Sequence, residues 1–387
     1  MAILNPSQAA AIAKGVYNIR MRDIGDALDI GGANALGTAG LFGFEDSTRF
    51  SGKSGAALFR PLSGFGFMAM GVGPFAGDLL LATRGTDTMA DWVTDANFGI
   101  ERGPGGMAVH AGFNTTFKSY LPAVQDFLKG RNPTRIHCIG HSLGGALAML
   151  NADFITANRI AEVRLYTFGA PRTGAADFAK QLTQRVGVGN IYRVSNPIDP
   201  VPMIPIFPFF HLPFGQEGLQ IGRTSKAPIS FAAHKMATSY VPGVAGKAWS
   251  DLRVDSPDDR EVKGWLEGKA EGMNSYFMGA AKLLDMIGRA LAYMIKLAGK
   301  VVGGAVGLAF TGGLTLLDQV AWMLSKAAQI ADEMNTGLQV LIGMIFKFLG
   351  RTAVKGTQIT VAFLRWVLDM LFTTLRAAAH RALSFLG

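Results

Sequence analysis

The hexapeptide GHSLGG at residues 140–145 constrains the fold of this chain more than any other segment. It follows an apolar run at 136–139 and precedes a stretch of small residues at 146–150. Glycines in a G-x-S-x-G pattern let the backbone turn sharply and pass close to neighbouring elements, which lifts the serine above the edge of a sheet. The segment predicts a strand, a tight turn and a helix, with Ser142 at the apex as a nucleophile. The neighbouring His141 is expected to pack beside the nucleophile rather than react.

A serine nucleophile needs a histidine base and an acid that orients the base. In α/β-hydrolases the three follow in the order Ser, Asp or Glu, His. Downstream of Ser142 the best acid is Asp199, in a loop just past an expected strand. Three histidines follow this acid, and the favoured base is His234. His211, in an apolar loop, is interpreted as a buried structural residue, and His380, on a basic and alanine-rich stretch, as a residue of a helix surface.

Several segments, in this order along the chain, resemble the class 3 lipases. These form the fungal-type α/β-hydrolase family of triacylglycerol lipases, phospholipases A1 and feruloyl esterases. The segments are LLATRGT at 80–86, ADWVTD at 90–95, VHAGF at 109–113, the GHSLGG turn, YTFGAPRTG at 166–174 and the acid loop at 196–202. The resemblance covers roughly residues 40–245, and nothing after about residue 260 matches the family pattern.

The resemblance implies the roles of nucleophile, acid and base for the same three residues. It also implies an oxyanion hole formed by Thr86 and the backbone N–H of Leu143, and a lid that contains Asp91 and Trp92. The implied chemistry is nucleophilic catalysis through an acyl-enzyme, which needs no metal and no cofactor. The single cysteine, Cys138, lies on an apolar strand and is expected to pack in the core rather than to bind a metal.

Alternating helix and strand patterns predict an α/β-hydrolase domain over residues 1–260, with a mostly parallel central sheet covered by helices on both faces. An N-terminal helix is expected at 7–29. Strands are expected at 65–72, 78–83, 135–139, 163–168 and 190–194, and crossover helices at 113–128, 146–157 and 175–184. The proline-rich apolar segment at 203–214 excludes a regular helix or strand. It is either a buried loop or a rim that contacts acyl chains or a bilayer.

The composition changes after a polar turn at 256–260, and an all-α, apolar C-terminal domain is expected over 261–387. This part holds 13 Lys and Arg against 8 Asp and Glu, so it carries +5 of the total charge of +9. Helices are expected at 273–297, 301–317, 320–330, 338–349 and 357–386. Basic amphipathic helices can lie on anionic bilayers. The uncharged run at 301–317 reaches only the lower limit of a bilayer span, about 17 residues.

Three interpretations of these helices stay open: packing on themselves and on the hydrolase, association with or insertion into a membrane, and binding of a partner or secretion component. The favoured function is a lipolytic carboxylic-ester hydrolase, a phospholipase A1 or A2 or a lipase, with a lipid or phospholipid substrate. The alternative is a membrane-binding or permeabilising protein that uses the hydrolase fold as a scaffold. Nucleic acid is excluded as a partner because the cations are dispersed among apolar residues.

The architecture also resembles bacterial antibacterial lipase effectors delivered by contact-dependent, type VI secretion, which implies a cognate immunity protein. Residues 1–20 lack the basic start and long apolar core of a Sec signal peptide. The chain is therefore expected in a bacterial cytoplasm before export by another route, with membrane association to follow.

Overall fold

The structure is a computed structural model in which two compact units are recognised. It describes residues 2–19, 34, 37–53, 62–85, 99–205, 209–216, 218–222, 230–253, 259–268, 280–301, 316–352 and 358–384. The first unit, called the sheet unit below, comprises Met1–Ser225, Ser230–Asp255 and Arg376–Gly387. The second, called the helical unit, comprises Lys226–Ile229 and Ser256–Leu375.

A seven-stranded sheet forms the centre of the sheet unit, in the order β1-β2-β3-β6-β7-β9-β11. The strands are β1 (Phe42–Lys53), β2 (Leu62–Gly71), β3 (Asp78–Thr83), β6 (Arg135–His141), β7 (Glu162–Phe168), β9 (Ile191–Ser195) and β11 (Leu219–Gln220). Neighbours from β3 to β11 are parallel, whereas β1 and β2 add to β3 as antiparallel strands. The predicted mostly parallel sheet is confirmed. The sequence analysis missed β1, whose charged and small residues do not alternate with apolar ones.

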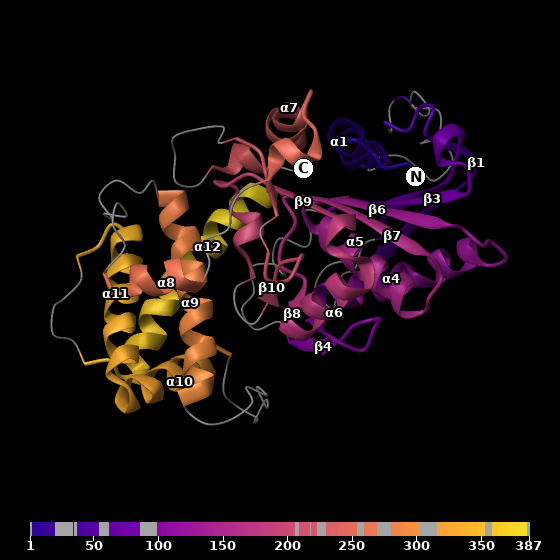
Figure 1. The fold of residues 1–387 in the computed structure, drawn as a ribbon. Helices are drawn as coiled ribbons and strands as arrows, with labels where there is room; N and C mark the ends of the chain where they lie inside the picture. The colour runs from indigo at the N-terminus through magenta and orange to yellow at the C-terminus, as the bar shows by residue number, and fades with distance from the viewer. Residues whose placement is uncertain are drawn as a thin grey trace. The chain divides into compact units, whose positions relative to one another are not determined.

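Helices cover both faces of this sheet (Figure 1), with α1 (Pro6–Gly15) and α7 (Val241–Val244) on one side. On the other side lie α4 (Ala111–Leu128), α5 (Leu143–Ala157) and α6 (Ala176–Val186). The first helix begins at a capping box, in which the side chains of Asn5 and Gln8 each accept from the other's backbone N–H. It is shorter than predicted, because a 3-10 turn at Val16–Ile19 follows it.

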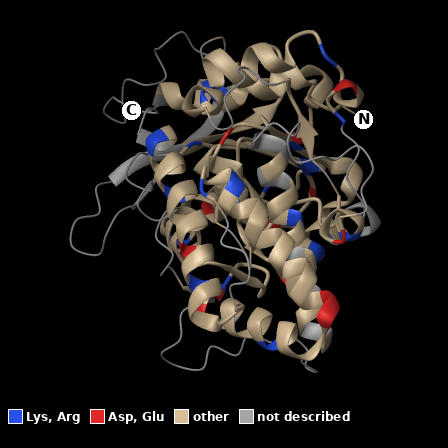
Figure 2. Ribbon diagram, turned by 90° about the vertical axis from the view of Figure 1, so that its left-hand side faces the viewer, with Lys and Arg blue, Asp and Glu red and all other residues tan. Residues whose placement is uncertain are grey.

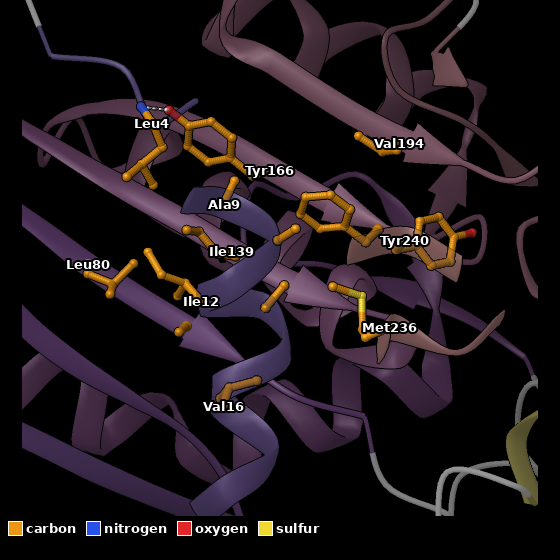
Figure 3. Packing of buried hydrophobic residues seen from close by; sticks show 14 of the residues in the cluster. Leu4, Ala9, Ile12, Val16, Leu80, Ile139, Tyr166, Val194, Met236 and Tyr240 are labelled. Carbon is orange, nitrogen blue, oxygen red and sulfur yellow. Dashed lines mark hydrogen bonds between the residues drawn. The ribbon is translucent and has the colours of Figure 1, made fainter. Parts of the chain in front are cut away.

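The N-terminal helix is fixed by a hydrophobic core shared with the sheet (Figure 3). Ile12 and Val16 lie over Leu80 and Ile139, and all four side chains are buried. Burial of an aliphatic side chain of this size stabilises the folded state by about 1.5–3 kcal/mol. The core therefore holds the next residue, Tyr17, at a defined place beside the carboxyl ends of the strands.

A second, four-stranded sheet has the order β10-β8-β5-β4. Its strands are β4 (Ile100–Arg102), β5 (Ala108–His110), β8 (Gly174–Ala175) and β10 (Phe209–Phe210). The prediction that no strand occurs within 203–214 was therefore wrong, because Phe209 and Phe210 pair with β8. A strand of two residues at the edge of a sheet leaves the prolines outside the hydrogen-bonded ladder, where they are tolerated.

The described part of the helical unit is helical, as predicted, with α8 (Asp259–Leu266), α9 (Ala280–Val301), α10 (Leu316–Ile330), α11 (Asp332–Phe348) and most of α12 (Val361–Ser384). The sequence analysis missed α8, which begins within the predicted polar turn at 256–260. Most of the uncharged run at 301–317 lies outside the described residues. Of the helices that the structure describes, none is both long and apolar enough to cross a membrane.

The last turns of α12 belong to the sheet unit. Ala379 and Ala382 are buried there, and the guanidinium of Arg381 lies 6.0 Å from the ring centroid of Phe231. The end of α12 thus packs close to the segment that carries His234.

Candidate active site

Ser142 lies at the sharp turn between β6 and α5. Its φ of 58° and ψ of −133° are a strained backbone conformation for a residue other than glycine. The N–H of Ser142 donates to the carbonyl of Phe168 at 2.9 Å. The hydroxyl of Thr83 lies 2.6 Å from the carbonyl oxygen of Gly144 and 3.1 Å from that of Ile139. The neighbouring strands therefore hold the turn from both sides.

Two glycines of the hexapeptide permit this close packing. A Cβ at Gly140 would lie 2.1 Å from the carbonyl oxygen of Gly144, and a Cβ at Gly144 would lie 2.4 Å from the carbonyl oxygen of Thr83. Both obstacles are backbone atoms. A side chain at Gly144 would therefore push the turn away from β3, and a side chain at Gly140 would push the start of α5 away from β6. The predicted reason for the glycines, close approach of the backbone, is confirmed.

The structure brings together the three residues predicted as a triad. Nε2 of His234 lies 2.8 Å from Oγ of Ser142, and Nδ1 of His234 lies 2.8 Å from Oδ2 of Asp199. All three side chains are fully buried. An ionised Asp199 accepts the proton of Nδ1, which leaves the lone pair of Nε2 facing the serine hydroxyl. This is the tautomer that a general base requires.

Tyr240 completes the surroundings of the acid. Its hydroxyl donates to Oδ2 of Asp199 at 2.6 Å, and the N–H of Val201 donates to Oδ1 at 2.9 Å. Burial and the nearby carboxylate raise the pKa of Tyr240 well above its usual range, so the phenol stays a donor. Hydrogen bonds thus compensate the burial of the Asp199 charge. Sequence reasoning missed Tyr240, since no pattern links it to Asp199.

His141 lies against the catalytic candidate, as predicted, with its ring centroid 4.7 Å from that of His234. Its Nε2–H donates to the backbone carbonyl of His234 at 2.8 Å, and the hydroxyl of Tyr17 donates to its Nδ1 at 2.9 Å. Burial and the neighbouring His234 lower the pKa of His141 well below its usual value. His141 is therefore a neutral residue of this site.

The oxyanion side of the site is described in part. Leu143 is the first residue of α5, so its N–H has no carbonyl partner within the helix and is available to an oxyanion beside Ser142. Thr86, Asp91 and Trp92 lie outside the described residues. Their roles in the oxyanion hole and in a lid stay predictions.

The other two candidate histidines are occupied elsewhere. Nε2–H of His211 donates to the carbonyl of Pro202 at 2.7 Å, which fits the predicted structural role, although His211 is half-buried and not buried as predicted. His380 is exposed on α12. Cys138 is buried, and within the described part of the chain no group of His, Cys, Asp and Glu side chains is placed to hold a metal ion.

Two arginine side chains hold the apolar loop that follows Asp199 in place through hydrogen bonds to its carbonyls. Arg172 donates to the carbonyls of Met203 and Pro205, and Nε of Arg193 donates to the carbonyl of Leu212 at 2.7 Å. Among its apolar residues, the described ones that are buried are Ile204, Phe209, Leu212 and Pro213. This favours the interpretation of a loop packed on the core.

Comparison with known proteins agrees with this geometry. Residues 80–209 match the family model "Lipase (class 3)". The chain is 34% identical over 142 residues to the secreted mono- and diacylglycerol lipase 1 of Fusarium solani, which covers 35% of this chain and 42% of that protein. It is 28% identical over 220 residues to the phospholipase A1-II 1 of Oryza sativa subsp. indica, which covers 48% and 54%.

A third relative is the toxin TseL of Vibrio cholerae, 36% identical over 102 residues, which cover 26% of this chain and 15% of the toxin. The matched segments thus span about half of the length of these relatives, or less.

Proposed function

Because residues 80–209 match the class 3 lipase family model, we propose that this chain is a serine-dependent lipolytic carboxylic-ester hydrolase. The observation that carries the proposal is the unbroken hydrogen-bonded series from Ser142 through His234 to Asp199. The strained elbow and the supported acid are further arguments, since a protein that used this fold only as a scaffold would need neither.

The proposed reaction follows from the placement of the three groups. Nε2 of His234 takes the hydroxyl proton of Ser142 as Oγ of Ser142 attacks the ester carbonyl. The N–H of Leu143 stabilises the resulting oxyanion, together with a donor expected from Thr86. The imidazolium then gives its proton to the leaving alcohol, so that an acyl-enzyme remains. Water, activated by the same imidazole, hydrolyses this ester and returns Ser142 to its free form.

The proposed substrate is an acyl ester of glycerol, in a phospholipid or in a neutral glyceride. Two relatives support this class of substrate. One is named a mono- and diacylglycerol lipase and the other a phospholipase A1. Product analysis by mass spectrometry on vesicles of mixed phospholipids and glycerides tests the proposal. Free fatty acid with lysophospholipid would indicate a phospholipase A, and the position of the remaining acyl chain would separate A1 from A2.

Ser142→Ala, purified and assayed in parallel, is the control. If the wild-type chain releases no fatty acid but makes vesicles leak a trapped dye, the ester hydrolase is wrong and the permeabilising scaffold is favoured. Leakage that disappears together with fatty acid release in Ser142→Ala supports the hydrolase.

For the helical unit we propose association with a membrane surface. Trp322 on α10 and Trp366 on α12 are each 47% exposed, and amphipathic rings of this kind favour the interface between lipid and water. Figure 2 shows Lys and Arg scattered along the helices among other residues. This distribution suits weak attraction to anionic lipid better than a dense nucleic-acid surface.

The likeness to a protein named as a toxin supports an antibacterial role with a cognate immunity protein as partner. Production of the chain in the periplasm of a bacterial host should then stop growth, and Ser142→Ala should be harmless. Equal growth arrest by both forms would contradict an effector that acts through ester hydrolysis.

A further inference from the structure

A second hydrogen-bonded series runs behind the triad. The N–H of Gly85 donates to the hydroxyl of Tyr17 at 3.3 Å, and this hydroxyl donates to Nδ1 of His141 at 2.9 Å. Nε2–H of His141 then donates to the backbone carbonyl of His234 at 2.8 Å. The series joins the N-terminal segment, the residues that follow β3, the elbow and the segment that carries the base.

The direction of each hydrogen bond is fixed by its end groups. The carbonyl of His234 can only accept, so Nε2 of His141 must carry its proton. In the neutral ring Nδ1 is then an acceptor, and the donor that it needs is the hydroxyl of Tyr17. Since the N–H of Gly85 can only donate, the oxygen of Tyr17 accepts it.

Gly85 itself lies against the nucleophile. A Cβ on this glycine would lie 3.2 Å from the hydroxyl oxygen of Tyr17, 3.4 Å from Cβ of Ser142 and 3.5 Å from Cβ of Leu143. Gly85 directly precedes Thr86, the predicted oxyanion donor. The tyrosine hydroxyl is therefore hydrogen bonded on one side to the segment that follows β3 and on the other to His141, which contacts the backbone of the base.

We propose that Tyr17 and His141 are a pair of positioning residues. Together they hold the segment that follows β3 and the backbone of His234 at fixed distances from Ser142. The inference rests on the proposed ester hydrolysis and extends it to a residue outside the family segment at 80–209. The hydrogen bonds of this series reach the backbone of His234 rather than its ring. These hydrogen bonds therefore act on the distance between His234 and Ser142. This distance matters because the rates of proton transfer and the stabilisation of the oxyanion both fall steeply when the groups shift by about 1 Å.

The neutral state of His141 is part of this arrangement. During the reaction a positive charge develops on His234, whose ring lies 4.7 Å away. A charged ring at His141 would repel it, whereas the neutral ring that burial enforces does not. His141 can thus orient the base without raising the energy of the imidazolium.

Tyr17→Phe removes the hydroxyl that links the two sides and keeps the ring. In the full chain, with a short soluble ester as substrate, we expect kcat to fall about tenfold and KM to change by less than about twofold. His141→Leu should lower kcat to a similar extent, and the double variant should be little worse than either. His141→Gln, which can still donate and accept, should recover most of the loss.

Tyr192→Phe is the matched control, because it removes a tyrosine hydroxyl from the same unit at a residue whose ring stacks on Tyr166 and contacts Trp249. It should leave kcat unchanged. The downfield NMR signal of the His234 Nδ1 proton gives a second reading without any substrate. This signal should shift or broaden in Tyr17→Phe and stay as in the wild type in Tyr192→Phe.

A folded Tyr17→Phe with wild-type kcat and an unchanged signal overturns the positioning role, even if its unfolding temperature is lower. Losses in the two single variants that multiply in the double variant also overturn the pair. A wild-type chain that hydrolyses no ester overturns the proposed function alone, because the NMR comparison still decides whether Tyr17 positions His234.

Discussion

The two units of this chain differ in what they bury. The sheet unit buries a network of polar side chains, among them the triad, His141, His137 and Asp78. Among the described residues of the helical unit, Ser325 is the one polar residue that is buried. Its hydroxyl donates to the carbonyl of Ile359. Because a buried polar group destabilises the fold unless it is hydrogen bonded, such a network marks the place where function constrains the fold.

The same difference explains how far the sequence of each unit predicts its role. The elbow demands glycines and a serine in a fixed local order, so the motif alone identified Ser142 and its surroundings. The helical unit needs only apolar residues at helical spacing, and many sequences with many functions satisfy that requirement. Its helices other than α8 were predicted, but their periodicity says nothing specific about what they bind.

The largest effect expected is the loss of the nucleophile from the sheet unit. Ser142→Ala should lower kcat on a soluble ester by about 10⁶-fold, His234→Ala by a similar factor, and the double variant should be little worse, because triad members act as a unit. Steady-state kinetics on purified protein measures this. Circular dichroism should show unchanged helix content, since both changes only remove side-chain atoms and the Ser142 side chain makes no capping hydrogen bond to α5.

A His234→Ala variant with near wild-type turnover would exclude this residue as the base. In that case His211→Ala becomes the decisive comparison, because His211 is the remaining histidine candidate in the apolar loop.

Replacing a glycine by alanine should have opposite effects on stability in the two units. Gly144→Ala should destabilise the sheet unit by about 3 kcal/mol and abolish activity, because its Cβ would meet the backbone of Thr83 at 2.4 Å. Gly288 lies in the middle of α9, where an added Cβ would meet no atom within 4 Å. Gly288→Ala should stabilise its helix by up to about 1 kcal/mol, since alanine has the higher helix propensity.

Urea unfolding monitored by hydrogen exchange and mass spectrometry reports each unit through its own peptides. Equal, small effects of both substitutions would show that the close approach at Gly144 relaxes easily, and the account of the elbow would then fail.

The stability of the two units should also respond differently to acid. Burial lowers the pKa of His110 from 6.5 to about 4. The unfolded chain therefore binds a proton that the folded sheet unit does not between these values, so stability falls as the pH drops through this window, by about 3 kcal/mol from this residue. The sequence at 256–375 contains no histidine, so the helical unit should lack this contribution.

The measurement is hydrogen exchange at pH 7 and pH 4.5 on the full chain. His110→Asn keeps an acceptor for the N–H of Gly112 at the start of α4 but cannot titrate. It should lose less stability between the two pH values than the wild type. An equal loss in both forms would remove His110 as the cause.

The sequence predicted the parallel strands β3, β6, β7 and β9, the elbow and the three residues that the structure brings together as a triad, because each has a local or ordered signature. It missed the two-residue parallel strand β11. It did not predict the links that hold them. Tyr17 and His141 are 124 residues apart, and Tyr240 lies 41 residues from Asp199. A contact of this kind depends on how the folded elements pack, and neither partner carries a pattern that points to the other. The same holds for the two-residue strand β10, which exists only because β8 lies beside it.

The smallest effect expected concerns the exposed tryptophans of the helical unit. Trp322→Ala and Trp366→Ala should each weaken binding to anionic vesicles several-fold, because each removes a large ring that favours the lipid interface. Turnover of a soluble ester should not change, since both residues belong to the unit without the triad. Point variants are preferable to a truncation, because the end of α12 packs in the sheet unit. Val188→Ala, which removes an apolar side chain that is 42% exposed on the sheet unit, is the matched control and should bind as the wild type does. Vesicle sedimentation at low and high salt measures all three. If the tryptophan variants and the control bind equally well, the exposed rings have another role, and a protein partner becomes the better explanation of this face.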